Sequence, residues 1–247
     1  MKKTLLFSAL AILFLWLAWL IAYFVVRNDY LLPSFGETMK RLGRLLIDAA
    51  FWRAFANTLL RTLWSFLLSF VLGAVLALIA NLHGALRAFL APVISVLRTV
   101  PTMAIILILL LWTGPLGAPV IVSLLVLLPA CYAAVLASLD EVREGYGDLA
   151  RAFGVDWKRK IFKMYLPLAA PSVLGQAGAI CSMGLKITIS GEVLANTYRS
   201  LGGLMQEAQT FVDMPRLMAL TLVSVLLGFL LEGICFFAYK LIVRWRA

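Results

Sequence analysis

Four polar side chains in a long apolar run near the end of the chain are the residues that could contact a solute. Lys186, Thr188, Ser190 and Glu192 all lie in this run. A charge near the centre of a bilayer costs about 2.5–3.5 kcal/mol, so these side chains should face protein or a water-filled path. Residues four apart share a face of a helix, which pairs Thr188 with Glu192 and Lys186 with Ser190. We therefore expect two polar strips on one helix.

Two interpretations of these four residues are open. In the first, they line a translocation path, where lysine would favour a small anion such as a sulfonate. In the second, Lys186 or Glu192 is neutralised by a charge on another helix and acts as structural glue. Candidates for that neutralising charge are Glu232 and Arg61.

Motifs for catalysis are missing from the sequence. It contains no phosphate-binding loop of the Gly-x-x-x-x-Gly-Lys-Ser/Thr type and no Gly-x-Ser-x-Gly elbow, and His83 is its one histidine. The three cysteines lie in apolar runs without a Cys-x-x-Cys pair, which is typical of small buried hydrophobic residues. We therefore expect neither an enzyme nor a chain with a metal or cofactor of its own.

A second polar feature is the stretch from Asp140 to Pro171, which interrupts the apolar second half of the chain. Its first half, through Phe153, has helical spacing of apolar and charged residues. Gly154 is a typical helix end, and Asp156 is a typical N-cap for a second short helix that closes before Pro167. The pattern predicts two short helices around a glycine corner, with exposed charges of both signs.

The composition places these features in a membrane protein. The chain of 247 residues is 63% hydrophobic and 14% charged, with a mean hydropathy of +0.99. A soluble domain of this size could not bury so much apolar surface. The net charge of +10 is explained by Lys and Arg kept on the cytoplasmic side, and no basic-aromatic nucleic-acid module is present.

Hydropathy predicts an all-α membrane protein with six spans. Residues 1–26 form an N-terminal transmembrane helix, 27–56 an external amphipathic segment, and 57–247 the core, with a cytoplasmic loop at 140–167. Five spans is the alternative, if the short third run is re-entrant. The expected spans lie at about 5–26, 58–82, 101–112, 120–139, 168–195 and 216–243.

Four further expectations concern details of this topology. Residues 113–119 are too rich in Gly and Pro for helix, and 201–204 reads as a turn. Four glycines of the fifth span should allow close helix packing. The distribution of Lys and Arg, including Lys2, Lys3, Arg244 and Arg246, favours both termini in the cytoplasm. The four glycines are Gly175, Gly178, Gly184 and Gly191.

The polar loop resembles a known motif. Asp148-Leu-Ala-x-x-x-Gly154 is followed by nine residues and then Met164-Tyr-Leu-Pro167. This spacing resembles the EAA loop of ATP-binding-cassette importer permeases, Glu-Ala-Ala-x-x-x-Gly-x9-Ile-x-Leu-Pro, with Asp148 in place of the Glu. Flanking blocks at 57–66, 101–117 and 184–194 are similar to the nitrate, sulfonate and taurine permease family, from about residue 31 onward.

The resemblance implies a type I importer permease in the bacterial inner membrane. Its partners would be a second copy of the chain, two ATPase subunits that bind ATP and Mg²⁺, and an extracytoplasmic solute-binding protein. The transported solute would be a small anion such as a sulfonate, taurine or nitrate. The ATPases would dock on the cytoplasmic loop through Asp148, Ala150, Arg151, Gly154, Asp156, Lys158, Arg159, Leu166 and Pro167. A self-contained channel or secondary transporter is the alternative function.

Overall fold

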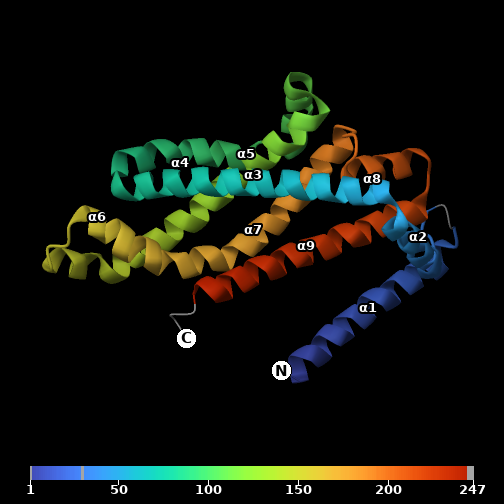
Figure 1. Cartoon of the computed structure of the whole chain (residues 1–247), viewed down its shortest axis with the longest axis horizontal. Coiled ribbons are helices and arrows are strands. Elements are labelled where there is room, and N and C mark those ends of the chain that lie inside the picture. The colour runs from blue at the N-terminus through green and yellow to red at the C-terminus, as the bar shows by residue number, and fades with distance from the viewer. Residues whose placement is uncertain (1, 29–30, 244–247) are drawn as a thin grey trace.

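The structure, a computed structural model, describes residues 2–28 and 31–243, and this part of the chain contains helices and no strand. The all-α prediction is confirmed. Figure 1 shows an elongated bundle with the α6 corner at one end and α2 and α8 at the other. The helices are α1 (Lys2–Val26), α2 (Phe35–Ile47), α3 (Ala49–Leu82), α4 (Gly84–Thr99), α5 (Thr102–Ala152), α6 (Trp157–Lys160), a π-helical turn (Ile161–Tyr165), α7 (Leu166–Leu194), α8 (Leu201–Thr210) and α9 (Met214–Ile242).

The described residues include four helices long and apolar enough to cross a membrane. They are Ala49–Leu82, Thr102–Ala152, Ile161–Leu194 and Met214–Leu241, and Leu13–Val26 is a shorter apolar helix. The third and fourth predicted spans are the two arms of α5. Arg244 and Arg246, which favoured a cytoplasmic C-terminus, lie outside the described residues, as do the side chains of Lys2 and Lys3.

The prediction that residues 113–119 cannot be helical is wrong. The chain is helical on both sides of Gly114, whose φ of 69° and ψ of −177° make the whole break. Pro115 follows directly, at the first position of the next helix, where a missing N–H costs nothing. Pro119 cannot donate to the Pro115 carbonyl, and Thr197 Oγ1 donates to that oxygen instead, at 2.7 Å.

The second helix of the loop also differs from its prediction, because it does not close before Pro167. It runs through a π-helical turn into α7. The Leu166 N–H donates to the Ile161 carbonyl, an i→i−5 bond, and Pro167 follows directly inside the continuous helix, where it has no N–H to donate to the preceding turn. The loop therefore continues, as helix, into the membrane helix that carries Lys186 and Glu192.

The predicted role of the fifth-span glycines is confirmed for three of the four. A Cβ on Gly184 would lie 2.8 Å from Leu127 Cδ1, and one on Gly191 would lie 3.0 Å from Pro119 Cα. One on Gly178 would lie 3.3 Å from Cys235 Cβ, whereas Gly175 has nothing within 4 Å. Small residues thus let α7 approach both α5 and α9 closely.

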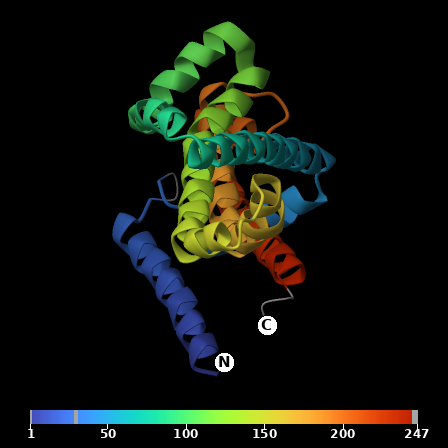
Figure 2. The same ribbon diagram turned by 90° about the vertical axis from the view of Figure 1, so that its left-hand side faces the viewer.

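Three further helices complete the arrangement. The amphipathic helix predicted after the first span is α2, which buries Thr38 and Leu45 and begins at the N-cap Ser34. α4 was not predicted; it buries Leu90 and Ile94 and lies along α3 and α5. Figure 2 shows α1 standing apart from the bundle, and it meets α2 through an edge-on contact of Trp19 with Phe35.

Candidate functional site

The glycine corner of the 140–167 hairpin is built by a helix-ending motif. Gly154 has a φ of 60°, its N–H donates to the Arg151 carbonyl, and the Val155 N–H donates to the Ala150 carbonyl, each at 3.1 Å. This pair of bonds is the Schellman arrangement, which favours glycine at the left-handed position. The Lys160 N–H then donates to the Asp156 carbonyl at 2.9 Å, so α6 starts directly after Asp156. The predicted helix end and helix start are confirmed.

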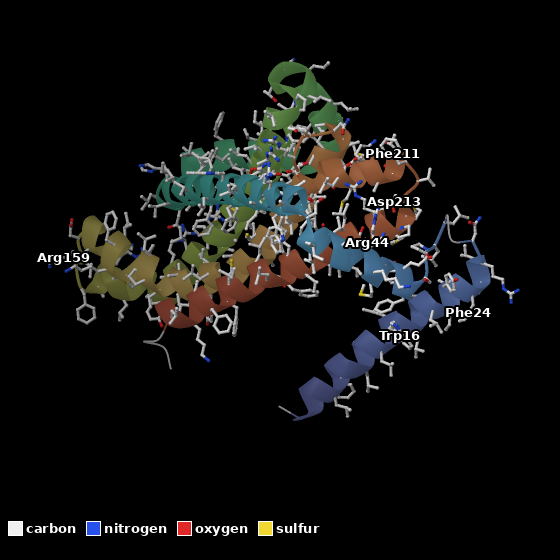
Figure 3. All side chains as sticks on the ribbon, turned by 45° about the vertical axis from the view of Figure 1, so that its right-hand side comes forward. Trp16, Phe24, Arg44, Arg159, Phe211 and Asp213 are labelled. Atoms are coloured by element: carbon white, nitrogen blue, oxygen red, sulfur yellow. The ribbon has the colours of Figure 1, made fainter. Side chains whose placement is uncertain are left out.

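The predicted docking residues of the hairpin gather at one end of the molecule, where Figure 3 labels Arg159. Asp148 and Arg151 form an ion pair along α5 with side chains 91% and 77% exposed. Asp156, Arg159 and Leu166 are also exposed, Pro167 is half-buried, and Ala150 is buried. The side chain of Lys158 lies outside the described part of the chain. Their role in docking stays a prediction.

The hairpin also exposes apolar side chains that the sequence reasoning missed. Phe153 is 77% exposed, Phe162 66% and Leu149 56%. Beside them, an open groove of ≈ 550 Å³ lies between the end of α5 and α6 and carries charges of both signs. Large apolar side chains grouped with charges are typical of a protein-binding surface. The groove is lined by Arg143, Glu144, Gly147, Asp148, Arg151 and Lys160.

α7 carries two polar strips, as the four-residue spacing predicted. Thr188 and Glu192 are buried, and Thr188 hydrogen-bonds Ser123 of α5 at 2.8 Å. Lys186 and Ser190 are exposed on another face, where Ser190 Oγ donates to the Lys186 carbonyl at 2.9 Å. The buried strip holds helices together, and the exposed strip is open to a partner or a solute.

Glu192 is the centre of the buried strip. Its carboxylate is 0% exposed and accepts from Arg61 Nη1 at 2.8 Å and from Thr58 Oγ1 at 2.8 Å. This is the arrangement of the structural interpretation, with Arg61 of α3 as the neutralising charge. A place for Glu192 or Thr188 on a translocation path stays a prediction.

The same carboxylate caps α8. The Gly202 N–H donates to Glu192 Oε2 at 3.2 Å, the Leu201 N–H donates to Thr58 Oγ1 at 2.9 Å, and the Gly203 N–H donates to the N-cap Ser200 at 2.9 Å. Three backbone N–H groups at the start of α8 thereby have acceptors, and the Glu192 carboxylate lies at the positive end of the α8 dipole. Residues 201–204 are thus the first turn of α8, which corrects their prediction as a turn between spans.

Gly202 should be irreplaceable in this arrangement. A Cβ there would lie 2.7 Å from the Ile189 carbonyl oxygen and 2.7 Å from the Val193 nitrogen. It would also clash with Glu192 Cβ. Backbone atoms cannot swing away, so we expect Gly202→Ala to lower the free energy of unfolding by about 1–3 kcal/mol. Thermal unfolding in detergent measures this. Gly43→Ala in α2 is the control, because nothing lies within 4 Å of a Cβ there; equal melting temperatures for both variants would refute the expectation.

The exposed strip borders a cavity between α7 and α9. The cavity has a volume of ≈ 280 Å³, and its charged lining residues are Lys186 and Glu232. Glu232 accepts a hydrogen bond from Ser182 Oγ at 2.6 Å. Glu232 was expected as a possible neutralising charge for Lys186, but no ion pair within 4 Å joins the two among the described residues.

Comparison with known proteins places the chain among transport proteins. A family model described as "Binding-protein-dependent transport system inner membrane component" matches residues 69–246. The taurine transport system permease protein TauC of Escherichia coli (strain K12) is 25% identical over 238 residues, which cover 94% of this chain and 86% of that protein. A probable ABC transporter permease protein of Haemophilus influenzae is 25% identical over 175 residues, covering 70% and 71%.

Solved structures share the fold. The inward-facing MetNI methionine ABC transporter matches with a TM-score of 0.67 at 17% identity, over 77% of this chain and 94% of that one. An amino acid ABC transporter matches with a TM-score of 0.57 at 18% identity, over 76% and 89%.

Proposed function

The chain belongs to the family of binding-protein-dependent transport system inner membrane components, and from that premise we propose how this permease is coupled and what it carries. It is the membrane component of an ABC importer. Two copies of the chain assemble with two ATPase subunits, which bind the ATP and Mg²⁺, and with an extracytoplasmic solute-binding protein. The complex lies in a bacterial inner membrane, with both termini of the chain in the cytoplasm.

The 140–167 hairpin is the element that couples the ATPases to the membrane helices. The observation that supports this most directly is its helical continuity with α7 through the π-helical turn, together with its exposed charged and aromatic surface. A displacement of the corner at Gly154 therefore moves α7 as a lever. Closure of the ATPases on ATP pulls the two hairpins together and rocks the bundle between inward-open and outward-open states.

The solute is a small molecule with an anionic group, of the sulfonate, taurine or nitrate class. Lys186 supports this assignment, because it is an exposed lysine on the cavity between α7 and α9. The similarity to a taurine permease points the same way. The external protein captures the solute, and the permease passes it along the exposed strip of α7.

Asp148→Ala tests the coupling role. The side chain is 91% exposed and pairs only along its own helix turn, so its loss should leave the melting temperature unchanged. We expect the affinity for the ATPase subunit to fall by about tenfold, as for a residue central to an interface. Copurification and ATP-driven uptake in proteoliposomes measure this. Glu37→Ala in α2 is the matched control, an exposed acid elsewhere; normal coupled transport by Asp148→Ala would show that this acid is dispensable.

A further inference from the structure

The cavity between α7 and α9 is lined by one cationic side chain and one anionic side chain. Figure 1 shows these two helices running next to each other over part of their length, where they contact one another. Lys186 on α7 and Glu232 on α9 line the same space of ≈ 280 Å³. Both side chains are exposed, although each sits in a helix apolar enough to cross a membrane. Two charges at such a position need water, protein or a charged solute beside them.

The two charges are offset by about one helical turn. A Cβ on Gly178 would lie 3.5 Å from Glu232 Cα, and one on Gly228 would lie 3.9 Å from Leu185 Cδ2, so α7 and α9 run antiparallel. The Glu232 carboxylate accepts from Ser182 Oγ at 2.6 Å and so lies at the level of Ser182, four residues from Lys186 along α7. At 1.5 Å per residue this is about 6 Å along the helix axis. A short molecule with a charge at each end could meet both side chains at once.

The hydroxyl groups that line the cavity already donate hydrogen bonds within the protein. Thr221 Oγ1 and Ser224 Oγ donate to carbonyls one turn earlier in α9, at 2.9 Å each, and Ser182 Oγ donates to Glu232. Lys186 is thus the one strong donor left for an anion among the described lining residues. Glu232 keeps acceptor sites for a cation, because a carboxylate has about four and Ser182 fills one.

We propose that this cavity is a solute subsite for a short zwitterion, with Lys186 facing the anionic head group and Glu232 facing an ammonium group. A simple anion such as nitrate would leave the Glu232 carboxylate uncompensated in the same small space and would be repelled by it. The inference rests on the proposed function, since it takes the exposed strip of α7 as part of the path. It narrows the solute class from any small molecule with an anionic group to amine-bearing sulfonates or carboxylates.

Solute binding to the permease–ATPase complex in nanodiscs, without the external protein, tests the proposal. The probes are taurine and isethionate, which differ by an ammonium in place of a hydroxyl, and the readout is the shift in melting temperature with concentration. We expect the wild type to bind taurine about tenfold more tightly, because a charge-assisted hydrogen bond is lost with isethionate. Glu232→Gln should abolish this preference, whereas Glu37→Gln in α2 should keep it.

Two results would overturn the proposal. One is equal affinity of the wild type for the two probes, which needs no variant and so does not depend on how Glu232→Gln folds. The other is an unchanged preference in Glu232→Gln. If the complex couples ATP hydrolysis to uptake and yet gives either result, the zwitterion site is refuted and the proposed function stands. A complex that neither binds the ATPase nor takes up solute would instead refute the proposed function.

Discussion

Replacing Glu192 with leucine should lower the free energy of unfolding by about 3–5 kcal/mol, enough to remove most of the folded permease from the membrane. The carboxylate is fully buried, so its loss leaves the Arg61 guanidinium without a counter-charge. It also leaves the Gly202 N–H without an acceptor at the start of α8. Thermal unfolding of the purified variant, and its yield from membranes, measure the effect.

A double-mutant cycle separates this structural role from a role in transport. Arg61→Met alone should be as damaging as Glu192→Leu, because it leaves a buried carboxylate, whereas Arg61→Met with Glu192→Leu should recover part of the stability. Additive losses would contradict the pairing. Glu192→Gln keeps the shape and can still accept from Gly202, so it should be the mildest change. If it folds normally but transports nothing, Glu192 acts on the path as well.

The local signals in the sequence predicted the hairpin well, because its geometry is set by neighbouring residues. Gly154 ends a helix in the left-handed conformation whatever surrounds it, and Asp156 precedes the next helix. The prolines at 113–119 led to a wrong prediction, because their effect on the helix depends on residues distant in the sequence. At 113–119 the single residue Gly114 makes the break, and Thr197, distant in sequence, satisfies the carbonyl that Pro119 leaves free.

The role of Glu192 could be narrowed from the sequence but not decided. Spacing placed it on a separate strip from Lys186, and Arg61 was one of two named partners. Which partner it takes depends on how α3 packs on α7, and Thr58 and Gly202 reach it from 134 and 10 residues away. The cavity is likewise a tertiary feature, since Ser182 and Glu232 are 50 residues apart. Periodicity in the sequence cannot predict a contact between residues so far apart in the chain.

α7 contributes to three features of the structure. Its first turn continues the hairpin, its buried strip fixes α3, α5 and α8, and its exposed strip borders the cavity. Because Leu127 of α5 packs against Gly184 and the Pro119 backbone packs against Gly191, we expect a push at the hairpin to be transmitted to α5. A substitution on the exposed strip should then alter transport without altering assembly.

Lys186→Met should abolish uptake of the solute while the complex still assembles and hydrolyses ATP at its basal rate. The lysine is exposed and forms no ion pair with the described residues, so methionine of similar length should leave the melting temperature unchanged. The substitution removes the donor for the anionic head group. Loss of a charge-assisted interaction in a confined site should lower the uptake rate tenfold or more, since each factor of ten corresponds to about 1.4 kcal/mol. Uptake of labelled taurine into proteoliposomes, with ATPase activity measured in parallel, checks this.

Lys186→Arg and Lys240→Met give the matched controls for that measurement. Arginine keeps the charge and should retain part of the uptake, whereas Lys240 is an exposed lysine in the last turn of α9, away from the cavity lining, and its loss should leave uptake intact. If Lys186→Met transports at the wild-type rate, the exposed strip of α7 is not the solute path. If it loses assembly together with uptake, Lys186 is a structural charge whose partner lies in the second copy of the chain.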